Sequence, residues 1–149
     1  MFTDFLLASA HHVLVFALLA LLTAELFLVK PGIGRDTINR VAILDGIYGG
    51  VAIAVVAVGA ARVVWGLKGW DAYVGNVWFW HKIGVFVLVG LLSVLPTIRF
   101  TRWRKAVAAD PSFTAPDGEV KAARRIIHAE AGLFMLIPIF AAAMARYGA

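Results

Sequence analysis

The chain has 149 residues, of which 62% are hydrophobic and only 15% charged, and its mean hydropathy is +0.86. A water-soluble domain of this length could not cover so much apolar side chain with polar surface, so a soluble globular protein is excluded. The formal charge of +5 does not indicate a nucleic-acid partner, because the basic residues gather beside apolar segments, where anionic lipid attracts them. The absence of cysteine excludes disulfides, thiolate metal sites and iron–sulfur ligation.

Four apolar segments follow one another along the chain. Runs without Asp, Glu, Lys or Arg cover Phe5–Ala24, Gly46–Ala61, Ile83–Ile98 and Ala131–Ala145. At about 1.5 Å per residue, each run with its flanks crosses a hydrocarbon core of about 30 Å. We therefore expect an all-α fold, a four-helix transmembrane bundle with spans at about 4–29, 41–65, 78–98 and 122–147. Residues 1–149 form a single domain in this interpretation, and short connections make neighbouring helices antiparallel.

The basic residues predict the orientation of the bundle. The first and third loops hold ten of the 14 Lys and Arg residues, and the opposite side has Arg62, Lys68, Lys82 and Arg146. The positive-inside rule places the ten-residue side in the cytoplasm, so both termini are expected outside. The third loop, which contains Asp110-Pro111-Ser112 and Ala115-Pro116-Asp117-Gly118, is rich in turn residues and is expected to be mobile.

Ionisable residues inside lipid need partners or water, and here they fall into two layers. The outer layer, near the expected outer boundary, contains His11, His12, Arg62, His81 and Lys82. Asp4, His11 and Glu25 are separated by multiples of seven and so share one helical stripe, which directs His11 into the bundle. His12 is rotated by about 100° and faces the interior less directly.

The outer layer admits two interpretations. Imidazoles on facing helices can hold haem iron, so His11 with His81 or Lys82 would supply two nitrogen donors, while Arg62 and Lys82 would pair with propionates. Alternatively, His11 forms a hydrogen bond between helices, the cations reach the headgroups, and the tryptophans form an interfacial belt. Copper or proton transfer is a further alternative. Copper is disfavoured because cysteine is absent and Met135 and Met144 are not expected beside the outer histidines.

The inner layer contains Glu25, Asp45, His128 and Glu130. The carboxylates are expected to be salt-bridge partners that fix the helix register, with Glu25 paired to Arg124 or Arg125. His128 is expected to be a boundary histidine, and a second cofactor ligand or a proton relay is the alternative.

The chain also resembles known families. His11-His12, Ala24-Glu25 and Lys30-Pro31-Gly32, with Trp78-Phe79-Trp80-His81-Lys82, Gly90-Leu91-Leu92-Ser93 and the ending Ile137-Pro138 to Arg146, resemble an uncharacterised bacterial family of predicted four-helix membrane proteins. The layout is more distantly similar to HemJ-type protoporphyrinogen oxidases and CopD-type copper-resistance proteins. In the HemJ type, an early histidine is implicated in binding haem b and a Trp-x-His-x-Lys pattern begins a later helix. By this resemblance Trp78 and Lys82 match the pattern, His11 is the early histidine, and Trp80 stands where the pattern has histidine.

These observations lead to one functional hypothesis and one alternative. The hypothesis is a multi-pass protein of the bacterial cytoplasmic membrane that binds haem b or a porphyrin and has a redox role. If it is an enzyme, it is a membrane oxidoreductase acting on tetrapyrrole or quinone-type substrates. Iron would be held by His11 and His81, and Lys82 would contact propionate or substrate as the candidate catalytic residue. Arg62, Trp78 and His12 complete the candidate cofactor-binding set. The alternative is a non-catalytic accessory or assembly subunit of a larger membrane complex or a homo-oligomer, docked through the small residues of spans two and four.

Overall fold

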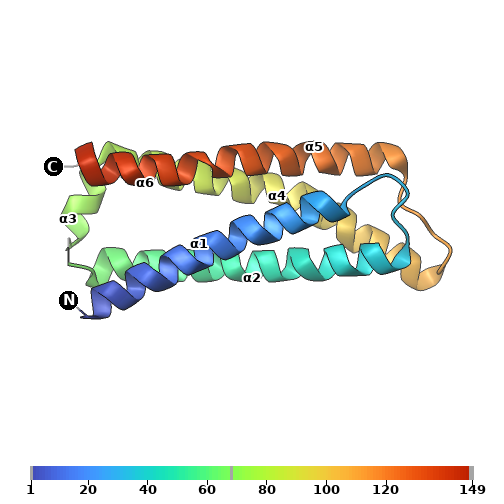
Figure 1. Ribbon diagram of the computed structural model, residues 1–149, viewed down its shortest axis with the longest axis horizontal. Coiled ribbons are helices and arrows are strands. Elements are labelled where there is room, and N and C mark those ends of the chain that lie inside the picture. Colours follow the sequence, from blue (N-terminus) through green and yellow to red (C-terminus); the bar gives the residue numbers. More distant parts are fainter. Residues whose placement is uncertain (1, 68, 148–149) are drawn as a thin grey trace.

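The computed structural model describes residues 2–67 and 69–147, and the described chain is helical without strands. Figure 1 shows the helices side by side in an elongated bundle. Their bounds are α1 (Phe2–Leu28), α2 (Arg35–Trp65), α3 (Gly69–Val74), α4 (Val77–Ala109), α5 (Asp117–Phe134) and α6 (Leu136–Tyr147).

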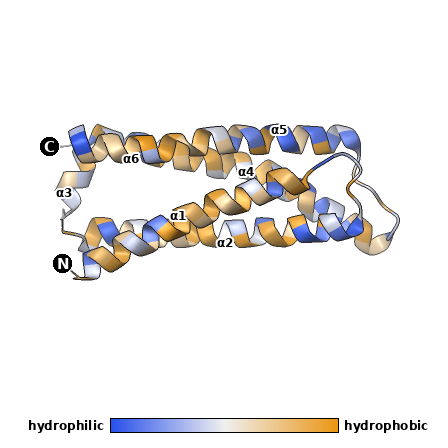
Figure 2. Cartoon of the chain, viewed as in Figure 1, coloured by the Kyte–Doolittle hydropathy of each residue, from blue (hydrophilic) through white to orange (hydrophobic). Residues whose placement is uncertain are grey.

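The predicted four-helix bundle is confirmed. Helices α1, α2 and α4, and the α5–α6 segment from Asp117 to Tyr147, are each long and apolar enough to cross a membrane. Apolar residues dominate the middle of the bundle and hydrophilic residues gather at its ends (Figure 2). This distribution requires a lipid bilayer as the solvent of the middle section. Both termini lie at one end, as an even number of spans requires, while the sidedness stays a prediction.

Two helices extend beyond the predicted spans at the end opposite the termini, which we call the cationic end. Helix α2 begins at Arg35 instead of residue 41, and α4 continues to Ala109 instead of residue 98. The third loop is consequently much shorter than expected, because α5 already starts at Asp117. The turn residues Asp110-Pro111-Ser112 and Ala115-Pro116 do lie outside the helices, whereas the residues on either side of this connection are helical.

These extensions are helical because they have an apolar face of their own. Phe100, Trp103 and Val107 are buried in α4 at spacings of three and four residues, and α5 buries Val120 and Ile127 with them. The buried indole Nε1 of Trp103 donates to a Glu119 carboxylate oxygen over 2.8 Å, and Arg102 forms an ion pair with the same carboxylate.

The fourth span is divided at Met135. Proline has no backbone N–H, so Pro138 cannot donate to the carbonyl four residues earlier, and the regular hydrogen-bond pattern is interrupted there. The N–H of Met135 bonds back to the carbonyl of Ala131, and α6 then continues to Tyr147. The predicted single helix over 122–147 is thus two nearly continuous helices.

Packing is uneven along the bundle. Helix α1 packs on α2 and α5, and α2 packs on α4, while α4 packs on α5 and α6. Within the described residues, neither α1 nor α2 contacts α6. At the end that carries the termini, which we call the cavity end, the α1–α2 pair therefore separates from α4 and α6. The short helix α3, which lies between the spans predicted at 41–65 and 78–98, bridges the two pairs (Figure 1).

Candidate functional site

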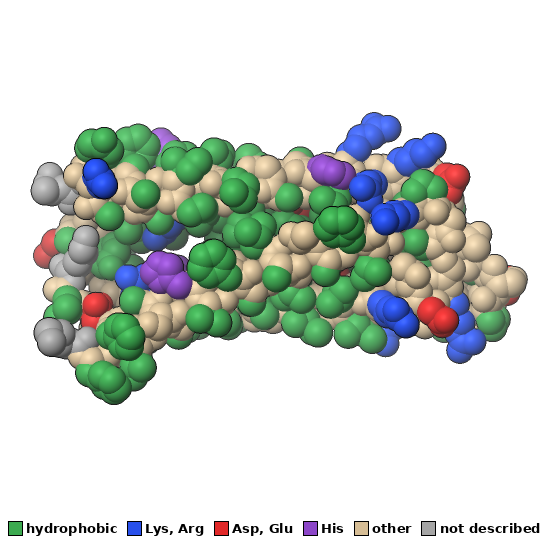
Figure 3. All heavy atoms as spheres, in the orientation of Figure 1, with side chains coloured by type: hydrophobic (Ala, Val, Ile, Leu, Met, Phe, Trp, Pro, Cys, Tyr) green, Lys and Arg blue, Asp and Glu red, His purple; other side chains and the backbone are tan. Residues whose placement is uncertain are grey.

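The separation of the helix pairs leaves a cavity of about 340 Å³ at the cavity end. Its walls are mostly aliphatic and aromatic, and three side chains with basic nitrogen atoms, His11, Arg62 and Lys82, also line it. No Asp or Glu is among the described residues that line the cavity. In the space-filling view the surface is hollowed between the two helix pairs, beside histidine and basic side chains (Figure 3). A volume above about 300 Å³ is within the range of small-molecule sites.

His11 reaches the cavity because α2 has a glycine opposite it. A Cβ atom placed on Gly59 would lie 3.2 Å from His11 Cε1 and 3.6 Å from Nδ1, so the imidazole rests directly on the backbone of α2. The Nδ1 atom is buried and has no hydrogen-bond partner. The other ring nitrogen, Nε2, is more than 4 Å from that Cβ position and is the nitrogen farther from α2. The prediction that His11 points into the bundle agrees with this placement.

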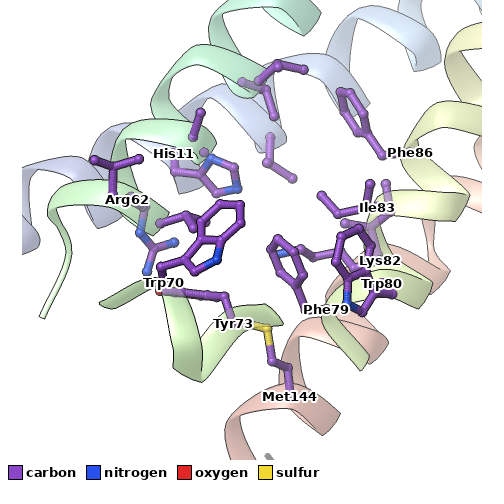
Figure 4. Close-up of a pocket in the computed structure, with 18 of the residues that line it drawn as sticks. His11, Arg62, Trp70, Tyr73, Phe79, Trp80, Lys82, Ile83, Phe86 and Met144 are labelled. Atoms are coloured by element: carbon purple, nitrogen blue, oxygen red, sulfur yellow. The ribbon is translucent and has the colours of Figure 1, made fainter. Parts of the chain in front are cut away.

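Arg62 and Lys82 place two cations on the cavity wall. Arg62 follows Gly59 by one turn of α2, so it lies on the same face of the helix. Its Nε atom is buried without a hydrogen-bond partner. Lys82, on the first turns of α4, holds its Nζ 5.3 Å from the centre of the Phe79 ring, a distance at which the cation is attracted to the ring face. Figure 4 shows His11 and Arg62 on one side of the cavity and Lys82 on the other.

Helix α3 closes part of the cavity end and is held by side-chain hydrogen bonds. Trp80 Nε1 donates to the carbonyl of Val74 at the end of α3 over 2.9 Å. The Asn76 side chain accepts from Trp78 N at the start of α4 and donates to the carbonyl of Met144 in α6. The chain from α3 into α4 is therefore tied to α6, which fixes the far wall of the cavity.

The structure brings together only some of the predicted site residues. His12 and His81 are both exposed, and each pairs its Nδ1 with the carbonyl four residues earlier, Ala8 at 2.7 Å and Val77 at 2.8 Å. Neither lines the cavity. The expectation that His11 and His81 face one iron is therefore wrong, because α4 is rotated so that His81 points away from the cavity.

Trp78 is also outside the cavity. Its ring stacks on Phe140 of α6, with 6.0 Å between ring centres, and lies 5.7 Å from the ring centre of His81. These three rings join α4 to α6, so Trp78 stabilises the wall and does not face a ligand. Across residues 2–67 and 69–147, no group of three or more His, Cys, Asp or Glu residues is arranged to hold a metal ion.

Several residues of the cavity are not among those predicted from the sequence. Its aromatic wall is formed by Trp70, Tyr73, Phe79, Trp80, Phe86 and Phe134. Trp70 and Trp80 line the cavity and are also 60% and 52% exposed, so their place in an interfacial belt stays a prediction. The thioether of Met144 also lines the cavity, so the expectation that this methionine lies away from the outer histidines is wrong.

The inner layer also differs from the prediction. Arg124 does not pair with Glu25, and its Nη1 donates instead to the carbonyls of Leu26 and Val29 at the end of α1, over 2.7 and 2.9 Å. Asp45 accepts a hydrogen bond of 2.8 Å from the Thr97 hydroxyl. His128 is exposed and pairs with the Arg124 carbonyl, in agreement with a boundary position.

The profile of one protein family, described as Predicted membrane protein (DUF2214), matches residues 3–148. The chain belongs to the DUF2214 family. Membership of this family agrees with the four apolar helices and brings no activity with it, because the family is one of unknown function. No curated protein and no solved structure matches the chain. The distant similarity to the HemJ-type and CopD-type proteins and the bacterial origin therefore stay predictions.

Proposed function

We propose that the cavity binds a planar, amphipathic, anionic ligand of the tetrapyrrole class. This ligand is haem b or a porphyrin, and the protein has a redox role. The observation that carries this proposal is the composition of the wall. Aromatic and aliphatic side chains surround His11, Arg62 and Lys82, and no lining carboxylate neutralises them. A neutral lipid tail would form no favourable charge contact with these cations. A flat apolar ring with carboxylate groups would pack on the apolar wall and pair its carboxylates with the cations.

The residues present fit a haem with one histidine ligand better than a haem with two. His11, whose Nδ1 has no hydrogen-bond partner, is the one histidine among residues 2–67 and 69–147 that lines the cavity. The Lys82 amine and the Met144 thioether are the other lining groups with nitrogen or sulfur donors of the kinds that coordinate metals. When bound there, haem iron would supply one-electron chemistry. His12, His81 and Trp78 do not line the cavity and are not proposed as ligands.

The protein side chains have separate tasks in this proposal. His11 presents Nε2 while Gly59 leaves room for the ring on the other side. Arg62 and Lys82 bind carboxylate groups, and the guanidinium is suited to a two-point contact while the ammonium acts as a point charge. The aromatic wall excludes water from the ring faces, which strengthens both charge contacts.

The first test uses the neighbouring histidine as a matched control. Detergent-purified protein is titrated with haem b, and the visible absorption spectrum is recorded for the wild type, His11→Ala and His12→Ala. We expect a saturable Soret band that His11→Ala abolishes or shifts and His12→Ala retains, because His12 is exposed and pairs with its own helix. Equal spectra for the two variants, or no saturable band in the wild type, would reject His11 as the ligand.

A second test addresses the cations without iron. Protoporphyrin and its dimethyl ester have the same ring, but only the first carries carboxylates. We expect Arg62→Gln and Lys82→Gln to weaken protoporphyrin binding, measured by quenching of tryptophan fluorescence, by about tenfold each, with little effect on the ester. Arg146→Gln is the control, since Arg146 is exposed at the same end of the bundle. A loss of the same size with the ester would show that the variants act on folding.

The accessory-subunit alternative is a second candidate that the wall composition does not favour. Stoichiometric co-purification of other membrane subunits in mild detergent, without bound pigment, is the result that would support it over ligand binding.

A further inference from the structure

A second group of polar residues lies inside the bundle, apart from the cavity and nearer the cationic end. It contains Glu25 of α1, Asp45 and Tyr48 of α2, Thr97 of α4 and Glu130 of α5, so four helices contribute to it. Glu25 is 2% exposed, Glu130 1% and Asp45 8%. We call Glu25, Asp45 and Glu130 the carboxyl cluster. The helices that carry them pack on one another, α1 on α2 and α5, and α4 on α2 and α5.

The carboxyl cluster has no cationic partner. The described chain contains a single ion pair, which joins Arg102 to Glu119 outside the cluster. Of the cations on the surrounding helices, Arg124 donates to backbone carbonyls of α1, and Arg99 donates to the carbonyl of Glu119. His128 is exposed and directed at the carbonyl of Arg124. The negative charge of three ionised carboxylates would therefore be uncompensated.

The three residues of the carboxyl cluster differ in their hydrogen bonding. Asp45 Oδ1 lies 2.8 Å from the Thr97 hydroxyl, which is also 2.9 Å from the carbonyl of Ser93 on its own helix, so Asp45 has a polar partner. Glu25 and Glu130 each have an Oε1 atom that is fully buried and has no hydrogen-bond partner. A carboxylate in this position is strongly destabilised by the loss of water without a compensating cation, whereas the neutral acid has only the smaller cost of an unpaired polar group.

We propose that Glu25, Asp45 and Glu130 form a proton-binding site within the bundle, in which Glu25 and Glu130 are protonated at neutral pH and exchange their protons with water. The ligand is the proton itself. Membrane-embedded carboxyl groups of this kind are a recurrent means of carrying protons. This inference does not rest on ligand binding at the cavity.

The test is chemical labelling of the full-length protein in detergent or lipid nanodiscs. A hydrophobic carbodiimide reacts with protonated carboxyl groups, and mass spectrometry locates the adducts. At neutral pH we expect Glu25 and Glu130 to be labelled about tenfold more than the exposed Asp36. Labelling of the two glutamates should fall as the pH is raised further. Labelling no greater than that of Asp36 would overturn the proposal.

Infrared spectroscopy gives an independent measurement on the unmodified protein. A protonated carboxyl group has a carbonyl stretching band that a carboxylate lacks. We expect such a band at neutral pH, diminished in Glu25→Gln and in Glu130→Gln, and unchanged in the control Asp36→Asn. The band of the wild type should decrease reversibly at alkaline pH. Its absence at neutral pH, or its persistence at every pH in which the bundle stays folded, would contradict a titratable site, whether or not the variants fold.

Discussion

Arg124 links the first and fourth spans, and its replacement is the clearest test of packing at the cationic end. The last carbonyl groups of a helix have no partner within the helix. Leu26 O in the last turn of α1 and Val29 O, one residue beyond the helix, accept hydrogen bonds from Arg124 Nη1. The guanidinium also places a positive charge at a helix C-terminus, where the helix dipole favours it.

The loss expected for Arg124→Ala follows from these contacts. A hydrogen bond from a charged donor contributes about 1.5–3 kcal/mol. The two bonds share one nitrogen, and the released carbonyls regain some water because Arg124 is only half-buried, so we expect the free energy of unfolding to fall by about 2–4 kcal/mol. Arg125 is exposed and serves as the control, for which a change within about 0.5 kcal/mol is expected. Arg124→Lys should recover part of the loss, since an ammonium group can still donate.

The assay is reversible unfolding of the purified protein by a denaturing detergent, followed by helical circular dichroism. The three variants and the wild type are compared in the same mild detergent. If Arg124→Ala and Arg125→Ala lose the same stability, the carbonyl contacts do not hold α1 to α5, and the reasoning is refuted.

Three further predictions concern the cavity, the cationic end and the orientation. Gly59→Val should move His11, because even a Cβ there would lie 3.2 Å from its ring, and should abolish His11-dependent haem absorbance. Gly50→Val, at a position with no atom within 4 Å of the new Cβ, is the control that should keep it. Glu119→Ala should lower the free energy of unfolding by about 1–3 kcal/mol, since a buried indole N–H loses its acceptor, and Glu119→Gln should lose less. Ser112→Cys introduces the sole cysteine of the chain, and in intact cells a membrane-impermeant maleimide should not label it; labelling without permeabilisation would reverse the predicted orientation.

The sequence by itself predicted the features that depend on solvent alone. Lipid requires long apolar helices with internally paired backbones, so four charge-free runs were enough to predict four spans. The concentration of basic residues in two loops likewise distinguished the cationic end from the end with the termini. The predicted spans are shorter than helices α2 and α4 at the cationic end. In these extensions apolar residues recur every three or four positions and do not form a continuous apolar run.

The tertiary structure alone decided which side chains meet. A helix surrounded partly by lipid is apolar on nearly every face, so its periodicity carries little information about its rotation. His11 could be directed inward by its stripe, but the outward rotation of His81 and the inward position of Met144 depend on how α4 and α6 pack at the cavity end. The burial of Glu25 and Glu130 without a cationic partner was equally hidden. It depends on the packing of α1 on α5, where Arg124 donates to backbone carbonyls of α1 and does not pair with these acids.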